Sequence, residues 1–514
     1  MSPKIIYAIV ILVLVVLSLG IFANGMAKPL GRDEQMYCTG GVLLAQGKMI
    51  YRDFSYVAQL PYHPLLYAVL FRILNTNYYL LVGRMVSVVC DVLVMLCVVG
   101  IYRRIFGRYA DCGLLLGVAS AILYVFNPLV DYANGYAWNH DVVILCVVLS
   151  YWLFISTDFK QKSRYWRIAV IGGLLTFATC MRITTALVQL LFFAALLSQP
   201  AESVKHRIKN VLPFLIVTVV VLIWPVWVIA SSWQAFFLNL FWIPRLYGKW
   251  LHEIGMVHNK LELTLSAFKT PGYLVLIAMA IYLCVVMIWQ QRKLAKINSR
   301  IMLFAALLVL VFFIIALIPP TMWKQYLAMP VPFIIISFAY PLLYLRQLAD
   351  KFKDNKQFKI AGVVVAVGVV VAVFSYSIVL YRTVIILVPE VWTPIQVHEI
   401  SQDIAKKTQE PRKILTLAPL FALEGGCDIY TELSCGSIVY RIGDRLSAWN
   451  RETTHTVGPG SLAKLLEKEA PSAVIINVEA ERMKFLEESL FKTAVRPDWE
   501  KKVYEYGPVV YFRR

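Results

Sequence analysis

Charged residues are scarce in this chain. Only 16% of its 514 residues are Asp, Glu, Lys or Arg, whereas 59% are hydrophobic and the mean hydropathy is +0.67. This balance excludes an ordinary soluble domain, in which about a quarter of the residues carry charge. Recurring apolar runs of about 18 or more residues predict a protein with many membrane-spanning helices.

Motifs for metals and nucleotides are missing as well. The sequence has neither a C-x-x-C pair nor an H-E-x-x-H stretch, and "EGGC" lacks both the G-x-G-x-x-G spacing and the P-loop lysine. No internal repeat is visible. We therefore expect no cofactor and no metal motif, while a divalent metal without such a motif stays open.

The apolar runs predict eleven membrane spans. A shorter apolar segment, 60–74, holds two prolines and is predicted to form a re-entrant or interfacial helix. The first span has no small-residue cleavage site after it, so we expect a retained helix. The spans are 5–23, 78–102, 110–127, 139–156, 167–180, 183–198, 211–231, 271–290, 300–318, 325–345 and 359–381.

The net charge of +19 comes largely from alternate loops between these spans. By the positive-inside rule such loops face the cytoplasm, so the charge does not indicate nucleic acid as a partner. The N-terminus is then inside, and the loops 24–77, 128–138, 232–270 and 319–324 lie outside, with everything after residue 381. The inside cations are Arg103, Arg104, Arg108, Lys160, Lys162, Arg164, Arg167, Lys205, Arg207, Lys209, Arg292, Lys293, Lys296, Arg300, Arg346, Lys351, Lys353, Lys356 and Lys359.

The composition changes in the last part of the chain. The stretches "KILTLAPL", "SAVIINV" and "KVYEYGPVVYF" predict strands, and "SLAKLLEKEA" and "AERMKFLEESLF" predict amphipathic helices. We expect a membrane domain over 1–381 and a small extracytoplasmic α/β domain over 382–514. In that oxidising compartment Cys427 and Cys435 are candidates for a disulfide.

Two adjacent acids follow the first span, in "KPLGRDEQMYCTGG". A carboxylate at the membrane surface is a candidate general base. Adjacent helical residues point about 100° apart, so Asp33 and Glu34 do not both reach one proton; one performs the chemistry and the other orients a neighbour. The alternative is that the acids begin a surface helix, where its dipole favours negative charge.

Cations near other spans suit a phosphate. Lys324 opens a late span after two prolines, where it either neutralises a phosphate or snorkels to the interface. Arg182 either contacts phosphate or marks a helix end. His140 and Asp141 open another span and are candidate substrate contacts, although Asn139 is equally suited to cap that helix.

Two further charges lie within a span. Arg84 and Asp91 are seven residues apart, on one face of the 78–102 helix. Intramembrane charges are costly, so both are expected to face the bundle interior in a structural role.

The layout resembles the GT-C glycosyltransferases, particularly the group of protein O-mannosyltransferases and the lipid A aminoarabinose transferase. One helix precedes a long outer loop with "DE" and "YRDF…LPYHPLLYAVLF", a later span opens with an acid, "KQY" opens a late span, and a polar domain ends the chain. The resemblance implies Asp33 as the essential acid with Glu34 in support, and Lys324 and Tyr326 at the donor phosphate. The outer loops also supply Tyr51, Asp53, His63 and Arg245 as candidate substrate contacts.

The function implied is transfer of a sugar from a polyprenyl-phosphate donor to a cell-envelope acceptor on the outer face of the membrane, with inversion. The acceptor is a lipid, a glycan or a protein; the missing large insert between late spans makes a protein acceptor less fitting. A multi-span transporter or flippase of a lipid-linked or anionic substrate is the alternative, although transporters often show repeats and midplane polar residues.

Overall fold

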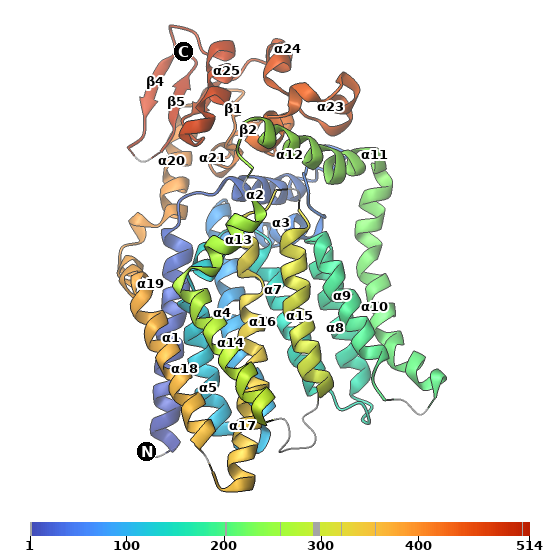
Figure 1. The fold of residues 1–514 in the computed structure, drawn as a ribbon. Helices are drawn as coiled ribbons and strands as arrows, with labels where there is room; N and C mark the ends of the chain where they lie inside the picture. The colour runs from blue at the N-terminus through green and yellow to red at the C-terminus, as the bar shows by residue number, and fades with distance from the viewer. Residues whose placement is uncertain are drawn as a thin grey trace.

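The computed structural model describes residues 3–200, 203–257, 259–290, 299–319, 321–354, 356–505 and 507–514. A bundle of apolar helices fills one half of the molecule and holds the N-terminus at its far end, while the C-terminus lies at the opposite end (Figure 1). The bundle helices are α1 (Pro3–Ala27), α4 (Tyr79–Phe106), α5 (Ala110–Val125), α7 (His140–Ser156), α8 (Arg164–Thr179), α9 (Ala186–Leu197), α10 (Val204–Ser231), α14 (Pro271–Gln290), α15 (Ser299–Leu317), α16 (Val331–Ser337), α17 (Ala339–Phe352) and α18 (Lys356–Ser375).

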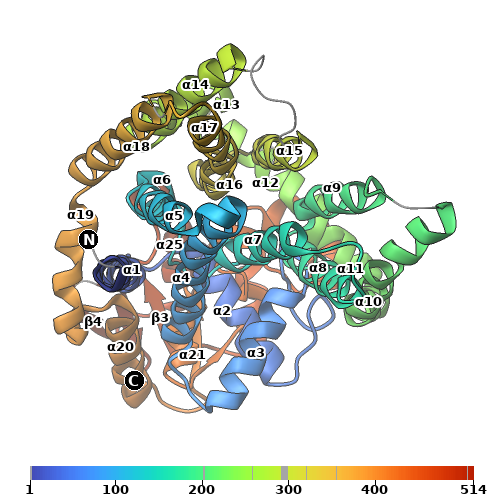
Figure 2. The ribbon, with the colours of Figure 1, turned by 90° about the horizontal axis from the view of Figure 1, so that it is seen from below.

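The bundle is organised around α4, which packs against both α5 and α7 (Figure 2). From there the packing continues from α7 to α8 and from α8 to α10. The outward sides of the peripheral helices carry large exposed apolar side chains, such as Ile223 at 63%, Trp289 at 70% and Phe374 at 80%. Apolar surface on this scale indicates contact with lipid rather than water.

Every predicted span coincides with a helix or helix pair of this bundle. Among the described residues, seven stretches are long and apolar enough to cross a membrane. One of them, Tyr79–Val125, consists of α4 and α5, which are joined by the short turn Gly107–Tyr109 and pack against each other. Helices α7 and α9 are shorter. The protein is thus an integral membrane protein, and the count of eleven spans stays a prediction.

Short helices form a layer between the bundle and the C-terminal part (Figure 1). The predicted interfacial segment becomes α3, which begins directly after Pro61 and packs against α2. The described α-helices that belong neither to the bundle nor to the C-terminal part are α2 (Arg32–Ala45), α3 (Tyr62–Leu74), α6 (Pro128–Ala133), α11 (Trp233–Phe237), α12 (Ile243–Glu253), α13 (Lys260–Phe268) and α19 (Ile378–Arg382).

The C-terminal part contains a five-stranded sheet of order β2-β1-β3-β5-β4. Strand β1 pairs in parallel with β2 and β3, and β5 pairs antiparallel with β3 and β4. The strands are β1 (Lys413–Thr416), β2 (Asp428–Ile429), β3 (Ala473–Ile476), β4 (Glu500–Val503) and β5 (Val509–Phe512). The helices are α20 (Thr393–Lys407), α21 (Pro419–Glu424), α22 (Ser437–Tyr440), α23 (Ala448–Thr454), α24 (Leu462–Lys468) and α25 (Lys484–Ala494).

Buried polar contacts fix the C-terminal part to the rest of the chain. Glu424 accepts a hydrogen bond at 2.7 Å from the backbone N–H of Leu80, in the first turn of α4, where no carbonyl of the helix is available. The side chain of Gln35 accepts one at 3.0 Å from the N–H of Leu420. Because both carboxamide and carboxylate are buried, these bonds favour one docked position.

The proposed disulfide between Cys427 and Cys435 is not formed. Both thiols are free and buried. Cys427 packs in the hydrophobic core beside β2, while the sulfur of Cys435 lies 3.0 Å from the carbonyl oxygen of Ser55 in the first outer loop. The two cysteines therefore serve different contacts, and the prediction is wrong because the chain between them forms β2 and a turn rather than a closed loop.

Candidate functional site

A cavity of about 530 Å³ lies where the layer of short helices meets the C-terminal part. Distant pieces of chain build its wall: the start of α2, the loop before α3, the segment from α6 to α7, α12, the segment before α16, α22 with the residue after it, and the segment after β3. Aromatic side chains dominate this wall, and a few charged groups stand among them. The residues that matter below are Asp33, Tyr37, Gln59, Tyr132, Tyr136, Trp138, Tyr247, Trp323, Gln325, Tyr326 and Arg441.

Asp33 lies in the first turn of α2 and lines this cavity. Removal from bulk water raises the pKa of Asp33; the nearby Arg32 lowers it, Glu34 raises it, and Arg441 lowers it. A carboxylate with a raised pKa is, once ionised, a stronger proton acceptor than a free aspartate. Asp33 is therefore a candidate base in the cavity wall.

Tyr37 stands one helical turn after Asp33, on the same face of α2. Burial raises the pKa of Tyr37 well above its ordinary value, and the negative charge of Asp33 raises it further. The phenol therefore stays protonated and is available as a hydrogen-bond donor in the cavity wall.

Glu34 points away from the cavity. Its side chain is fully buried and receives two hydrogen bonds from Arg84, each of 2.9 Å. The same carboxylate accepts from the backbone N–H of Ala137 at 2.6 Å and from that of Gly31 at 2.7 Å. The sequence put Glu34 in support of Asp33, and its oxygens tie the first loop to α4 and to the loop after α6.

Arg84 completes this buried contact from α4. Its guanidinium also donates to the backbone carbonyls of Gly25 at 2.9 Å, Lys28 at 2.7 Å and Pro29 at 3.0 Å. Arg84 thereby joins the end of α1 to the start of α2. The sequence predicts that Arg84 faces the bundle interior. Its ion pair with Glu34 and its hydrogen bonds to carbonyls explain how the charge is accommodated there.

A second polar network supports the loop between α6 and α7. The amine of Lys28 donates to the carbonyls of Tyr132 at 2.9 Å and Asn134 at 2.6 Å. Burial lowers the pKa of Lys28 to about 8, although Asp131 opposes the shift. Asp131 itself forms an ion pair with Arg382 at 2.7 Å. This loop carries Tyr136 and Trp138 into the cavity wall.

The candidate phosphate cations gather beside the cavity. The guanidinium of Arg182 lies over the ring of Tyr326, 4.7 Å from its centre. Lys324 is 5.9 Å from the ring centre of Tyr132, and the neighbours of Lys324, Trp323 and Gln325, line the cavity. Two cations therefore lie against aromatic rings that line the cavity, while Arg182 and Lys324 themselves are not part of its wall.

Two of the other candidate residues, Asp141 and His140, are buried at the start of α7. Asp141 accepts a hydrogen bond at 3.0 Å from the N–H of Gly135 and does not line the cavity. His140 is 4% exposed. Asp141 therefore supports the loop after α6, and neither residue lines the cavity.

The remaining candidates in the outer loops also lie outside the cavity wall. His63 is buried between the rings of Tyr37 and Tyr67, with centre distances of 4.7 and 4.3 Å. Tyr51 is buried in a left-handed backbone conformation and donates to the carbonyl of Gln59. Asp53 pairs with Arg52 at 2.8 Å, and Arg245 is exposed on α12.

Arg441 and Glu479 are site residues that the sequence did not single out. The side chains are 1% and 2% exposed and form an ion pair of 2.6 Å. Arg441 also donates to the hydroxyl of Tyr247 at 2.9 Å, while its Nε–H has no hydrogen-bond partner among the described atoms. Local sequence gives no signal for this pair, since its place beside Asp33 arises from docking of the C-terminal part.

No group of three or more His, Cys, Asp or Glu side chains in the described part of the chain is arranged to hold a metal ion. Two acids near the cavity, Glu34 and Glu479, are instead paired with arginines. The chemistry that the cavity offers is a base, phenol donors and cations.

Comparison with known proteins identifies the class to which this geometry belongs. A family model described as dolichyl-phosphate-mannose-protein mannosyltransferase matches residues 59–229. The crystal structure of ArnT from Cupriavidus metallidurans bound to undecaprenyl phosphate is similar, with a TM-score of 0.61 and 12% identity, over 99% of this chain and 98% of that one. The apo state of the same protein gives 0.58 and 12%, over 98% and 97%.

A more distant similarity links the chain to the Archaeoglobus fulgidus oligosaccharyltransferase tethered with an acceptor peptide. The TM-score is 0.50 and the identity 11%, over 91% of this chain and 68% of that one. A search of curated proteins found no match.

The protein thus shares its fold with ArnT. The predicted resemblance to the group of protein O-mannosyltransferases and the aminoarabinose transferase is confirmed. The family model and the fold together indicate a membrane glycosyltransferase.

Proposed function

We propose that the protein transfers a sugar from a polyprenyl-phosphate donor to a cell-envelope acceptor, with inversion at the sugar and with Asp33 as the general base. The observation that carries this proposal is the cavity itself, in which Asp33 meets Tyr326 and the cations beside it. The ArnT structure, similar over the whole length, holds undecaprenyl phosphate. A donor of the same chemical class suits this cavity.

The proposed reaction is a single displacement. The acceptor hydroxyl or amine attacks the anomeric carbon, the bond from that carbon to the phosphate oxygen breaks, and the polyprenyl phosphate leaves with the bonding electrons. The proton of the attacking group passes to the carboxylate of Asp33. All atoms and charges are then accounted for without a nucleotide.

Charge accumulates on the leaving phosphate during this step, since a diester becomes a monoester. Lys324 and Arg182 stand against Tyr132 and Tyr326, two rings of the cavity wall. Cations placed there stabilise the transition state more than the bound donor, and this difference raises the rate. Tyr326 and Tyr37 add phenol donors to the same wall.

Glu34 acts in this proposal as a positioning residue. It fixes the first turn of α2 through Arg84 and through the N–H of Gly31, so that Asp33 faces the cavity. A base held by buried hydrogen bonds needs little reorganisation when the acceptor arrives.

The cavity lies at the end of the bundle that carries residues 382–514, opposite the N-terminus (Figure 1). The cations of the loops at the opposite end support an orientation with the cavity and this C-terminal domain outside the cytoplasm and the N-terminus inside. In a bacterial cell this is the outer face of the inner membrane, where lipid-linked sugars and envelope acceptors meet.

The orientation is tested with cysteines introduced one at a time at Glu399 and Lys160, which are both exposed. The background carries alanine in place of the exposed Cys284. We expect a membrane-impermeant thiol reagent to label Glu399→Cys in intact cells and Lys160→Cys only after the membrane is opened. Labelling in the reverse order would place the site in the cytoplasm and contradict the proposal.

The phosphate site is tested by Lys324→Ala. We expect turnover to fall about 10- to 100-fold, corresponding to the roughly 1.5–3 kcal/mol that a hydrogen bond to a charged group contributes. The Michaelis constant for the lipid donor should rise less than turnover falls, and Tyr326→Phe should show a weaker loss. The assay follows transfer from a synthetic polyprenyl-phosphate sugar to membranes of a strain that lacks the protein.

The matched control is Lys269→Ala, which removes an exposed lysine that ends α13. It should leave both constants unchanged. If Lys324→Ala has wild-type kinetics, the lysine merely snorkels to the interface, and the phosphate site loses its main support.

A further inference from the structure

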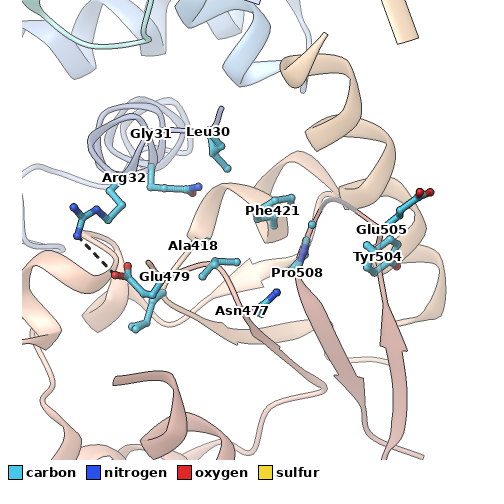
Figure 3. Close-up of a pocket in the computed structure, with 14 residues that line it drawn as sticks. Leu30, Gly31, Arg32, Ala418, Phe421, Asn477, Glu479, Tyr504, Glu505 and Pro508 are labelled. Carbon is cyan, nitrogen blue, oxygen red and sulfur yellow. Dashed lines mark ion pairs between the residues drawn. The ribbon is translucent and has the colours of Figure 1, made fainter. Parts of the chain in front are cut away.

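A second cavity, of about 440 Å³, adjoins the first on the side of the C-terminal sheet. Both cavities are lined by Leu30, Gly31 and Arg32 of the first loop and by Val478 after β3. Figure 3 shows these loop residues opposite the segments that follow β1 and β3, with the dashed contact from Arg32 to Glu479 between them. A molecule that fills the second cavity therefore reaches the border of the Asp33 cavity.

The second cavity occupies a particular place in the sheet. After β1 the chain turns through α21 to β2 on one side, and after β3 it turns through α25 to β4 on the other. The carboxyl ends of β1 and β3 are therefore a topological switch point, and open α/β sheets bind ligands in the crevice outside such a point. The wall residues Ala418 and Asn477 follow these two strand ends.

The backbone at this edge is arranged for a side chain to face the crevice. Asn477 follows β3 directly with a φ of 64°, in the left-handed region that asparagine tolerates better than most residues. Such conformations gather at ligand sites, where the surrounding structure holds them. Figure 3 shows Asn477 between Glu479 and Pro508, at the crevice.

The charges around the second cavity balance. Arg32 and Arg441 share the buried carboxylate of Glu479, at 3.8 and 2.6 Å, and Glu505 supplies the other negative charge. No cationic surplus is left here for a phosphate, in contrast to the first cavity, where Lys324 and Arg182 lie against rings of the wall. Polar groups that both donate and accept suit a neutral ligand with many hydroxyls.

The remaining wall is apolar and partly aromatic. Phe421, Tyr504 and Pro508 form flat surfaces beside the amides of Gln35 and Asn477. A few placed polar groups on an apolar wall are typical of a specific small-ligand site, and its volume lies within the usual range for such sites. The face of a sugar ring packs on flat apolar surfaces, while its hydroxyls take the polar contacts.

We propose that this cavity at the carboxyl ends of β1 and β3 is the acceptor subsite, and that it binds a neutral saccharide of a glycan acceptor. The saccharide is held by Asn477, Glu479 and Arg32 so that the next hydroxyl reaches Asp33 across the shared border. This inference rests on the proposed function, and it adds the class of acceptor and the residues that select it.

The test measures saccharide binding directly, on purified full-length protein in nanodiscs. Saturation-transfer NMR screens the methyl glycosides of glucose, galactose, mannose and N-acetylglucosamine and their neutral disaccharides, with inorganic phosphate as the competing anion. We expect the wild type to bind at least one neutral saccharide, and phosphate not to displace it. Failure of every neutral saccharide to bind, or displacement by phosphate, would overturn the proposal.

Substitutions place the binding in this cavity. Asn477→Trp fills the crevice and should weaken saccharide binding at least tenfold, and Asn477→Gly, which accepts the left-handed backbone, should weaken it a few-fold. Glu500→Trp is the matched control, because this exposed residue begins β4 and does not line the cavity. Equal saccharide affinity in Asn477→Trp and the wild type would contradict the assignment.

Binding of undecaprenyl phosphate to the same samples separates this proposal from the proposed function. All three variants should bind it as the wild type does, which also shows that they are folded. If undecaprenyl phosphate binds nowhere, the donor assignment fails whatever the saccharides do; if it binds and no saccharide does, only the acceptor subsite fails.

Discussion

Asp33→Asn is expected to lower turnover about 10²- to 10⁴-fold, the range that loss of a general base produces. The substitution keeps the shape of the side chain, and the contacts of Glu34 with Arg84 and Gly31 do not involve Asp33. Binding of the lipid donor and the melting temperature should therefore change little. The measurement compares turnover and undecaprenyl phosphate binding on the same purified samples.

A matched control for this variant is Asp53→Asn, which neutralises another outer-loop aspartate outside the cavity. It should keep nearly full turnover. Near-normal turnover of Asp33→Asn would show instead that Asp33 only serves the helix dipole at the start of α2.

The pH dependence of turnover tests the same assignment. Burial raises the pKa of Asp33, so turnover should be retained above this pKa and lost as the pH falls through it, at a higher pH than for a free aspartate. Because Arg441 lowers the pKa of Asp33, Arg441→Gln should move the acid limb of the profile to still higher pH. If the acid limb of the profile stays at the same pH in Arg441→Gln, Arg441 does not lower the pKa of the catalytic base.

Arg84→Met is expected to have the largest effect on stability. It leaves the carboxylate of Glu34 buried without its partner, and breaking a buried ion pair in this way costs about 3–5 kcal/mol. It also removes the donor for the carbonyls of Gly25, Lys28 and Pro29. A large drop in the melting temperature of the detergent-solubilised protein is the expected result.

The double variant Arg84→Met/Glu34→Gln isolates the charge effect, because it removes both members of the pair. It should melt at a higher temperature than Arg84→Met alone. Arg108→Gln, which breaks an exposed pair with Asp350, should leave the melting temperature nearly unchanged. A double variant less stable than Arg84→Met would mean that the backbone contacts, rather than the buried charge, determine the cost.

The apolar runs could be predicted from the sequence because a membrane helix depends on a local property, its length of apolar residues. All of them coincide with helices of the bundle. The strand predicted over "KVYEYGPVVYF" instead forms the hairpin of β4 and β5, with the turn near Gly507. Glycine followed by proline is a turn signal, and here it outweighed the strand propensity of the flanking residues.

The site could be predicted only where its signal is local. Two adjacent acids after the first span drew attention to Asp33, but their different roles depend on which face of α2 meets Arg84. Asp141 has the same kind of local signal, yet its carboxylate accepts a hydrogen bond from the N–H of Gly135 and is buried in the protein interior. Arg441 has no local signal, because it lies hundreds of residues after Asp33 in the sequence and comes to the cavity only when the C-terminal part docks.

The cavity around Asp33 has one consequence for the biogenesis of the protein. Asp33 comes from the loop after α1, whereas Arg441 and the neighbouring Glu479 come from the C-terminal part of the chain. A ribosome makes the chain from the N-terminus onward, so Asp33 is synthesised long before these partners. Under the proposed function, a half-made chain in the membrane therefore has no closed site in which to consume lipid-linked sugar, and activity begins only when the C-terminal part has docked.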